Sequence, residues 1–184
     1  MNFIIIHGVY SSPDDNWFPW LKKQLEGMGY EVIAPKFPTP LNQSLESWTR
    51  AFSQYEGKIN EETVMIGHSL GATFILNYLE KADKKIKAAI FVSGFHKLLG
   101  SSYDELNKTF VEKEFNWEKI KSSCGKFFVF ASDNDEYIPL EIGQELSRNL
   151  GAEMNVVHDG GHLNKKAGYD DFHLLLETII IEVD

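Results

Sequence analysis

Six short apolar runs, distributed along the whole chain, constrain the fold most strongly. Each run is three to five residues long, and most are continuous rather than alternating, as is typical of strands covered on both faces of a parallel sheet. Segments with a helical period lie between the runs. This alternation predicts an α/β fold, a doubly wound, mostly parallel sheet of about six strands with helices on both faces. The runs are Phe3–Ile6, Val32–Ala34, Val64–Ile66, Ala88–Val92, Phe127–Ala131 and Met154–Val157.

The intervening segments also contain helix-capping residues. Residues such as serine, asparagine and aspartate favour helix starts, whereas glycine favours helix ends. The expected starts are Ser44, Ser69, Asn116, the residue after Pro139, and Asp170 or Asp171, and the expected stop of the helix after Pro139 is Gly151.

The composition suits one domain spanning residues 1–184. The chain is 43% hydrophobic, which is enough for one full core, and its longest excursion between strands, at about 95–125, is expected to form only a minimal lid. The net charge of −9 argues against nucleic acid and anionic membrane surfaces as partners.

The first residues and the cysteine content bear on the compartment. The start, "MNFIIIHGVY", lacks the basic region of a signal peptide, and its apolar run is too short to cross a bilayer. The lone cysteine, Cys124, excludes an internal disulfide and a multi-cysteine metal site. We therefore expect a cytoplasmic protein.

Polar residues follow four of the six predicted strands. They are His7-Gly8, Ser69, the pair Asp133 and Asp135, and the pair His158 and His162. Because ligands of such folds bind at the carboxyl ends of the strands, these residues are expected to converge on one site.

Ser69 lies in the pentapeptide "GHSLG", between an apolar run and a helical segment. The pattern G-x-S-x-G in this context is typical of a nucleophile elbow, in which a strained turn lifts the serine hydroxyl above the sheet. The alternative is an ordinary helix N-cap, which the pentapeptide alone does not exclude. The chain has neither the dinucleotide fingerprint G-x-G-x-x-G nor a phosphate-binding loop.

A serine nucleophile needs an imidazole base, which is in turn oriented by a carboxylate. On the fold that carries a nucleophile elbow, the expected order along the chain is serine, acid, histidine, and this order is present. His162 is favoured over His158 because Gly160 and Gly161 form a flexible turn before it, whereas Asp133 and Asp135 remain equivalent on these grounds. The glycines argue against a zinc-binding helix, and the distal residues of a calcium loop are missing, so we expect no metal and no cofactor.

The chain resembles the small α/β-hydrolases grouped around retinoblastoma-binding protein 9 and the bacterial YdeN-like proteins. The resemblance covers nearly the whole chain and rests on "IIIHGVYSSPDDNWFPWLKKQLEGMGYEV", "LESWTRAF", "VMIGHSLGATFILNYLE", "FNWEKIK", "ASDNDEYIP" and "GGHLN". It implies an α/β-hydrolase fold. The L-x-C-x-E motif is absent, so a retinoblastoma-type partner is not expected.

The resemblance also implies a catalytic triad of Ser69, Asp135 and His162, and thereby selects Asp135 over Asp133. It implies an oxyanion hole formed by the backbone N–H groups of Leu70 and Val9, with Tyr10 as the alternative to Val9.

The activity expected from this triad is hydrolysis of a small ester-like acyl substrate through an acyl-enzyme, as in a carboxylesterase. Two alternatives stay open: a binding or regulatory protein with little turnover, and a peptidase or thioesterase that uses the same triad. Tyr10, Trp17, Phe95 and Tyr137 are candidate residues of the substrate pocket.

Overall fold

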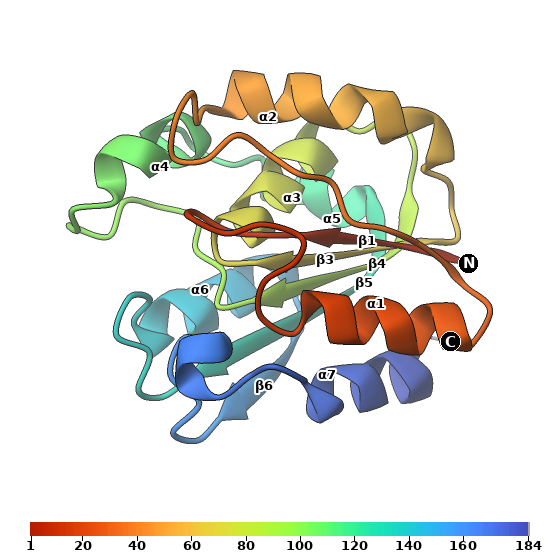
Figure 1. Ribbon diagram of the computed structural model, residues 1–184. Helices are drawn as coiled ribbons and strands as arrows, with labels where there is room; N and C mark the ends of the chain where they lie inside the picture. Colours follow the sequence, from red (N-terminus) through yellow and green to blue (C-terminus); the bar gives the residue numbers. More distant parts are fainter. Residues whose placement is uncertain (184) are drawn as a thin grey trace.

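The protein contains one six-stranded sheet in which every neighbouring pair of strands is parallel, so the predicted sheet is confirmed (Figure 1). The computed structural model describes residues 1–183; Asp184, the last residue of the predicted domain, lies outside the described residues. The strand order is β2-β1-β3-β4-β5-β6. The strands are β1 (Asn2–Ile6), β2 (Glu31–Ile33), β3 (Thr63–His68), β4 (Ile86–Val92), β5 (Cys124–Ser132) and β6 (Glu153–Val157).

Helices cover both faces of the sheet, as predicted. One face carries α2 (Leu45–Phe52), α3 (Leu70–Lys81), α4 (Asp104–Val111), α5 (Trp117–Ser122) and α6 (Leu140–Leu150), and the other carries α1 (Phe18–Gly27) and α7 (His173–Thr178) (Figure 1). Short 3-10 turns at Ser53–Lys58 and Lys165–Ala167 and a π-turn at Ile179–Val183 complete the described elements.

Two hydrophobic cores lie on opposite faces of the sheet because successive side chains of a strand point to opposite sides. In β1, Ile4 and Ile6 join the core beneath α2 to α6, whereas Phe3 and Ile5 join the core beneath α1 and α7. Both faces are buried, which explains why the run is apolar at every position.

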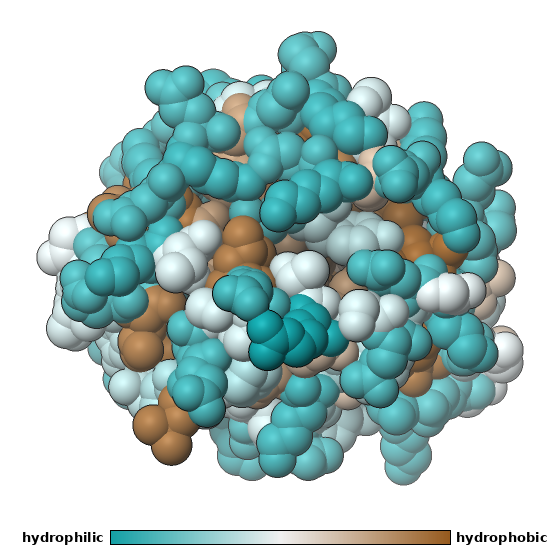
Figure 2. Space-filling view, turned by 90° about the horizontal axis from the view of Figure 1, so that it is seen from above, coloured by the Kyte–Doolittle hydropathy of each residue, from teal (hydrophilic) through white to brown (hydrophobic). Residues whose placement is uncertain are grey.

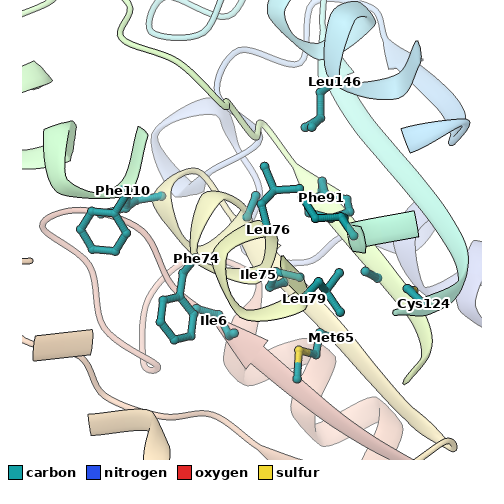
Figure 3. Packing of buried hydrophobic residues seen from close by; sticks show 14 of the residues in the cluster. Ile6, Met65, Phe74, Ile75, Leu76, Leu79, Phe91, Phe110, Cys124 and Leu146 are labelled. Atoms are coloured by element: carbon teal, nitrogen blue, oxygen red, sulfur yellow. The ribbon is translucent and has the colours of Figure 1, made fainter. Parts of the chain in front are cut away.

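Helix α3 is the centre of the larger core. Phe74, Ile75, Leu76 and Leu79 project from it toward side chains of the sheet and of α4 and α6 (Figure 3). The residue before α3 is Ser69, so this packing fixes the point at which the candidate nucleophile leaves the sheet.

Most of the expected helix ends are present, and one is wrong. Ser44 accepts a hydrogen bond from the Ser47 N–H, Asn116 accepts one from the Lys119 N–H, and Gly151 ends α6 in the left-handed conformation. The last helix, however, begins after Phe172, and neither Asp170 nor Asp171 caps it.

The surface above α2 is mainly hydrophilic, with small separate apolar patches, in the view from above (Figure 2). This fits the amphipathic pattern of α2, whose Trp48 and Phe52 are buried. Within residues 1–183, no helix combines the length and the apolar character that crossing a bilayer requires.

Candidate active site

Ser69 occupies a strained turn between β3 and α3. Its backbone has φ 54° and ψ −120°, a conformation that residues with a β-carbon rarely adopt. A β-carbon on Gly71 would lie 2.2 Å from the Ile6 carbonyl oxygen, and one on Gly67 would lie 2.5 Å from the Ala72 nitrogen. Both glycines are therefore required by close backbone contacts, which is the geometry of a nucleophile elbow and not of an ordinary N-cap.

We expect Gly71→Ala to lower the free energy of unfolding by about 3 kcal/mol or more, because backbone atoms must move to admit the methyl group. Gly57→Ala is the matched control, since a β-carbon there meets nothing within 4 Å. Chemical denaturation of both variants measures the difference. Equal unfolding midpoints would contradict the close packing of the elbow.

The carboxylate of Asp135 is buried in the loop after β5 and points toward His162. Its Oδ1 accepts hydrogen bonds from the N–H groups of Tyr137 and Ile138 at 2.9 and 3.1 Å. Its Oδ2 lies 2.8 Å from His162 Nδ1, and the side chain is only 1% exposed. Burial raises the pKa of Asp135, but the hydrogen bonds from His162 and the two backbone amides outweigh it and hold the pKa below its usual range.

His162 shares a cavity with Ser69. His162 is 9% exposed, and its Nδ1 lies 2.8 Å from Asp135 Oδ2. A charged carboxylate accepts only, so in the neutral imidazole the proton is on Nδ1 and Nε2 has the lone pair. No hydrogen bond among residues 1–183 uses Nε2 of His162 or Oγ of Ser69, and both residues line one cavity of about 420 Å³. The structure thus brings Ser69, His162 and Asp135 together.

The other predicted pair, Asp133 and His158, lies apart from this cavity. His158 Nδ1 is 2.5 Å from Asp133 Oδ2, and its Nε2 is 3.1 Å from an Asp159 oxygen. The hydrogen bond to Asp133 raises the pKa of His158. Within residues 1–183 these three side chains are the one group whose ligand atoms could surround a metal ion, but all three are exposed and already pair with one another.

Two residues that the sequence analysis did not assign to the site hold the His162 loop. Asn134 Oδ1 accepts the N–H of Gly161 at 2.7 Å, and His68 Nε2 donates to the carbonyl of His162 at 2.9 Å. His68 is fully buried, which lowers its pKa to about 3, so the ring stays neutral. Through its bond to the His162 carbonyl, the His68 ring supports the histidine loop from below.

His68 should make stability depend on pH. Below pH 6.5 the unfolded chain binds a proton at position 68 that the folded protein excludes until about pH 3, so stability falls as the pH is lowered through this window. The loss is about 1.4 kcal/mol per pH unit. We expect His68→Gln, which keeps an N–H donor without titrating, to flatten this slope in urea unfolding. His173→Gln, at an exposed position of α7, should leave the slope unchanged, and equal slopes in all three proteins would contradict the assignment.

The loop after β1 lies beside Ser69. His7 fixes it, since the Phe37 N–H donates to Nε2 at 3.0 Å and Nδ1 lies 2.9 Å from the Gly8 carbonyl oxygen. The N–H of Tyr10 donates to Thr39 Oγ1 at 2.9 Å. In contrast, the N–H of Val9 has no acceptor among residues 1–183. Leu70 is the first residue of α3, where backbone N–H groups lack intrahelical acceptors.

Three of the four predicted pocket residues line the cavity. Tyr10, Phe95 and Tyr137 are part of its wall, and Tyr10 is 63% exposed at its rim. The prediction for Trp17 is wrong. Its side chain is fully buried beneath the sheet, packs edge-on against Phe18, and donates from Nε1 to the Leu163 carbonyl at 2.9 Å.

The segment between β4 and β5 also contributes to the wall, mainly through residues before and within α4. They are Leu99, Ser101, Ser102, Tyr103 and Asn107. The sequence analysis did not single out any of them. The one available signal was a polar residue, Asn107, on the buried side of an amphipathic segment.

The chain matches known proteins over most of its length. Residues 3–179 match the family model described as serine hydrolase. The chain is 32% identical over 177 residues to the hydrolase YdeN of Bacillus subtilis (strain 168), with 95% of this chain and 92% of that protein covered. It is 30% identical over 164 residues to the serine hydrolase RBBP9 of Rattus norvegicus, with 89% and 84% covered.

The solved structures agree as well. The crystal structure of the ydeN gene product from B. subtilis matches with a TM-score of 0.92 at 31% identity, over 97% of this chain and 96% of that chain. Mouse alpha/beta hydrolase domain-containing protein 10 matches with a TM-score of 0.70 at 16% identity, over 97% and 88%, which shows a shared fold. The resemblance inferred from the motifs is confirmed, and the chain is a member of the serine hydrolase family with an α/β-hydrolase fold.

Proposed function

We propose that the protein hydrolyses carboxylic esters through an acyl-enzyme formed on Ser69. One observation carries the proposal: Asp135 holds Nδ1 of His162, and the other nitrogen is free in a cavity that Ser69 also lines. An imidazole in this tautomer is the base that a serine hydroxyl requires at neutral pH.

In the first half of the cycle, His162 Nε2 takes the proton of the Ser69 hydroxyl as Oγ bonds to the ester carbonyl carbon. The carbonyl π electrons move onto oxygen, and Asp135 stabilises the imidazolium. When the tetrahedral intermediate collapses, the ester C–O bond breaks and Nε2 gives its proton to the leaving alkoxide, which departs as the alcohol.

In the second half, His162 takes a proton from water while the water oxygen attacks the acyl carbon. The second tetrahedral intermediate then releases the carboxylic acid, and the proton returns to the Ser69 oxygen. Each step uses groups of this chain and water alone.

The oxyanion would be held by the N–H groups of Val9 and Leu70, each contributing about 3 kcal/mol to transition-state stabilisation. The free N–H of Val9 supports this choice, and the Tyr10 N–H is already bonded to Thr39. A binding protein without turnover is disfavoured, because Ser69 is accessible from the cavity and a free donor lies beside it.

A panel of short-chain p-nitrophenyl esters, matched acyl thioesters and aminoacyl amides tests the proposal. We expect hydrolysis of the esters to exceed the uncatalysed rate by several orders of magnitude, and mass spectrometry of acid-quenched enzyme to detect the acyl group on the protein. Hydrolysis of thioesters or amides without hydrolysis of esters would instead support a thioesterase or a peptidase. A lack of turnover with all three substrate classes would contradict the proposal that the protein is a hydrolase.

A further inference from the structure

Asn107 is a polar side chain buried in the wall of the active-site cavity. It lies in α4, is 4% exposed, and faces the same cavity as Ser69 and His162. Buried amide groups normally have hydrogen-bond partners, because an unpaired one loses its bonds to water and gains none in the protein. The partners of Asn107 therefore indicate what the cavity is built to hold.

A chain of hydrogen bonds fixes which end of the Asn107 amide faces away from the cavity. The Tyr10 N–H donates to Thr39 Oγ1 at 2.9 Å, so the single hydroxyl proton of Thr39 is free for Gln43 Oε1, 2.7 Å away. The Leu106 carbonyl can only accept, so the Gln43 atom 2.8 Å from it is Nε2, which donates to it.

The same Gln43 Nε2 lies 3.5 Å from Asn107 Oδ1, a long contact that only an acceptor can satisfy. Asn107 therefore turns its oxygen toward Gln43. Its Nδ2 is left as a donor, and no acceptor among residues 1–183 pairs with it.

The charges of the cavity restrict what this donor can bind. Among residues 1–183, no lysine or arginine is part of the wall, and the one formal charge there is the carboxylate of Glu136, which pairs with Lys166 at 2.5 Å. An anionic group such as a carboxylate or phosphate would lack a cation to pair with. A neutral acceptor oxygen would satisfy the Asn107 amide without a charge penalty.

We infer that Asn107 determines specificity and that the substrate carries a neutral acceptor oxygen, such as an ether, ketone or amide carbonyl, in addition to the scissile ester. This inference rests on the proposed ester hydrolysis. It identifies the substrates as oxygenated acyl esters in preference to plain hydrocarbon ones.

The test compares p-nitrophenyl esters of a straight-chain acid with analogues in which an ether oxygen replaces one methylene at successive positions. The enzymatic rate for each ester is divided by the rate at which hydroxide hydrolyses the same ester. We expect one ether analogue to exceed the hydrocarbon ester about tenfold in kcat/KM. Asn107→Leu, of similar size but without a donor, should reduce this ratio to about one. Lys108→Gln, on the exposed side of the same helix, should keep it.

Asn107→Asp provides a second test, because it retains the contact with Gln43 and turns an acceptor toward the cavity. It should lose the preference for the ether and favour the analogue with a hydroxyl group at the same position. Circular dichroism and thermal unfolding establish that each variant is folded. A ratio of about one in the folded wild type for every ether position would overturn the inference.

Binding measured without turnover separates this inference from the proposed function. Isothermal titration of Ser69→Ala with the same ester pair should give a Kd about tenfold lower for the ether analogue. Selective binding without turnover in the wild type would refute ester hydrolysis and leave the role of Asn107 standing. Turnover without selectivity in either measurement would refute the role of Asn107 alone.

Discussion

Replacing Ser69 with alanine is expected to lower kcat for ester hydrolysis by roughly 10⁴-fold or more, because it removes the oxygen on which the proposed acyl-enzyme forms. The fold should be unaffected. Oγ of Ser69 takes part in no hydrogen bond among the described residues, and alanine meets the same backbone strain at φ 54°. We therefore expect a change of less than about 1 kcal/mol in the free energy of unfolding. Steady-state kinetics and chemical denaturation measure the two effects.

Ser93 provides a matched control. It follows β4, the strand next to β3, has a φ of 47°, and is 2% exposed, and its Oγ has no hydrogen-bond partner among residues 1–183. It does not line the cavity. Ser93→Ala should keep the activity of the wild type within about twofold. Substantial turnover by Ser69→Ala would refute the nucleophile, and an equal loss in Ser93→Ala would show that the effect is not specific to the elbow.

Replacing Asp135 with asparagine is expected to lower kcat by about 10⁴-fold. An asparagine amide can donate to Nδ1 of His162, which places the imidazole proton on Nε2, where it blocks acceptance of the serine proton. KM should change much less than kcat, because Asp135 does not line the cavity that receives the substrate.

Asp133→Asn distinguishes this effect from a general loss of charge on the loop. Asp133 lies two residues away and pairs with the exposed His158. We expect its variant to change kcat less than about twofold. Comparable losses in both variants, or a larger loss in Asp133→Asn, would contradict the assignment of Asp135 as the acid.

The strands and the elbow could be predicted because their causes are local. A run buried on both faces must be apolar throughout, and "GHSLG" between a strand and a helix leaves little room for side chains near Ser69. The choice between Asp133 and Asp135 could not be made locally. Asp135 turns inward because the Tyr137 and Ile138 amides hold its carboxylate, and this geometry is not visible in the composition of the loop.

The prediction for Trp17 failed because nearness to a strand end does not determine on which side of the sheet a side chain lies. Packing against α1 and the bond to the Leu163 carbonyl, 146 residues away, bury it on the side opposite α3. Asn134, His68 and Asn107 were missed for a related reason. Their roles depend on partners in other loops, and a single polar residue gives no periodic signal.

The most direct test of the account is labelling with a fluorophosphonate, which reacts with activated serine hydroxyls, followed by peptide mass spectrometry. Asp135 holds Nδ1 of His162, and His162 and Ser69 line the same cavity, so we expect one adduct, on Ser69, which forms far more slowly in His162→Gln. An adduct on another residue, or equal labelling of Ser69 in His162→Gln, would contradict the claim that these three side chains activate one hydroxyl.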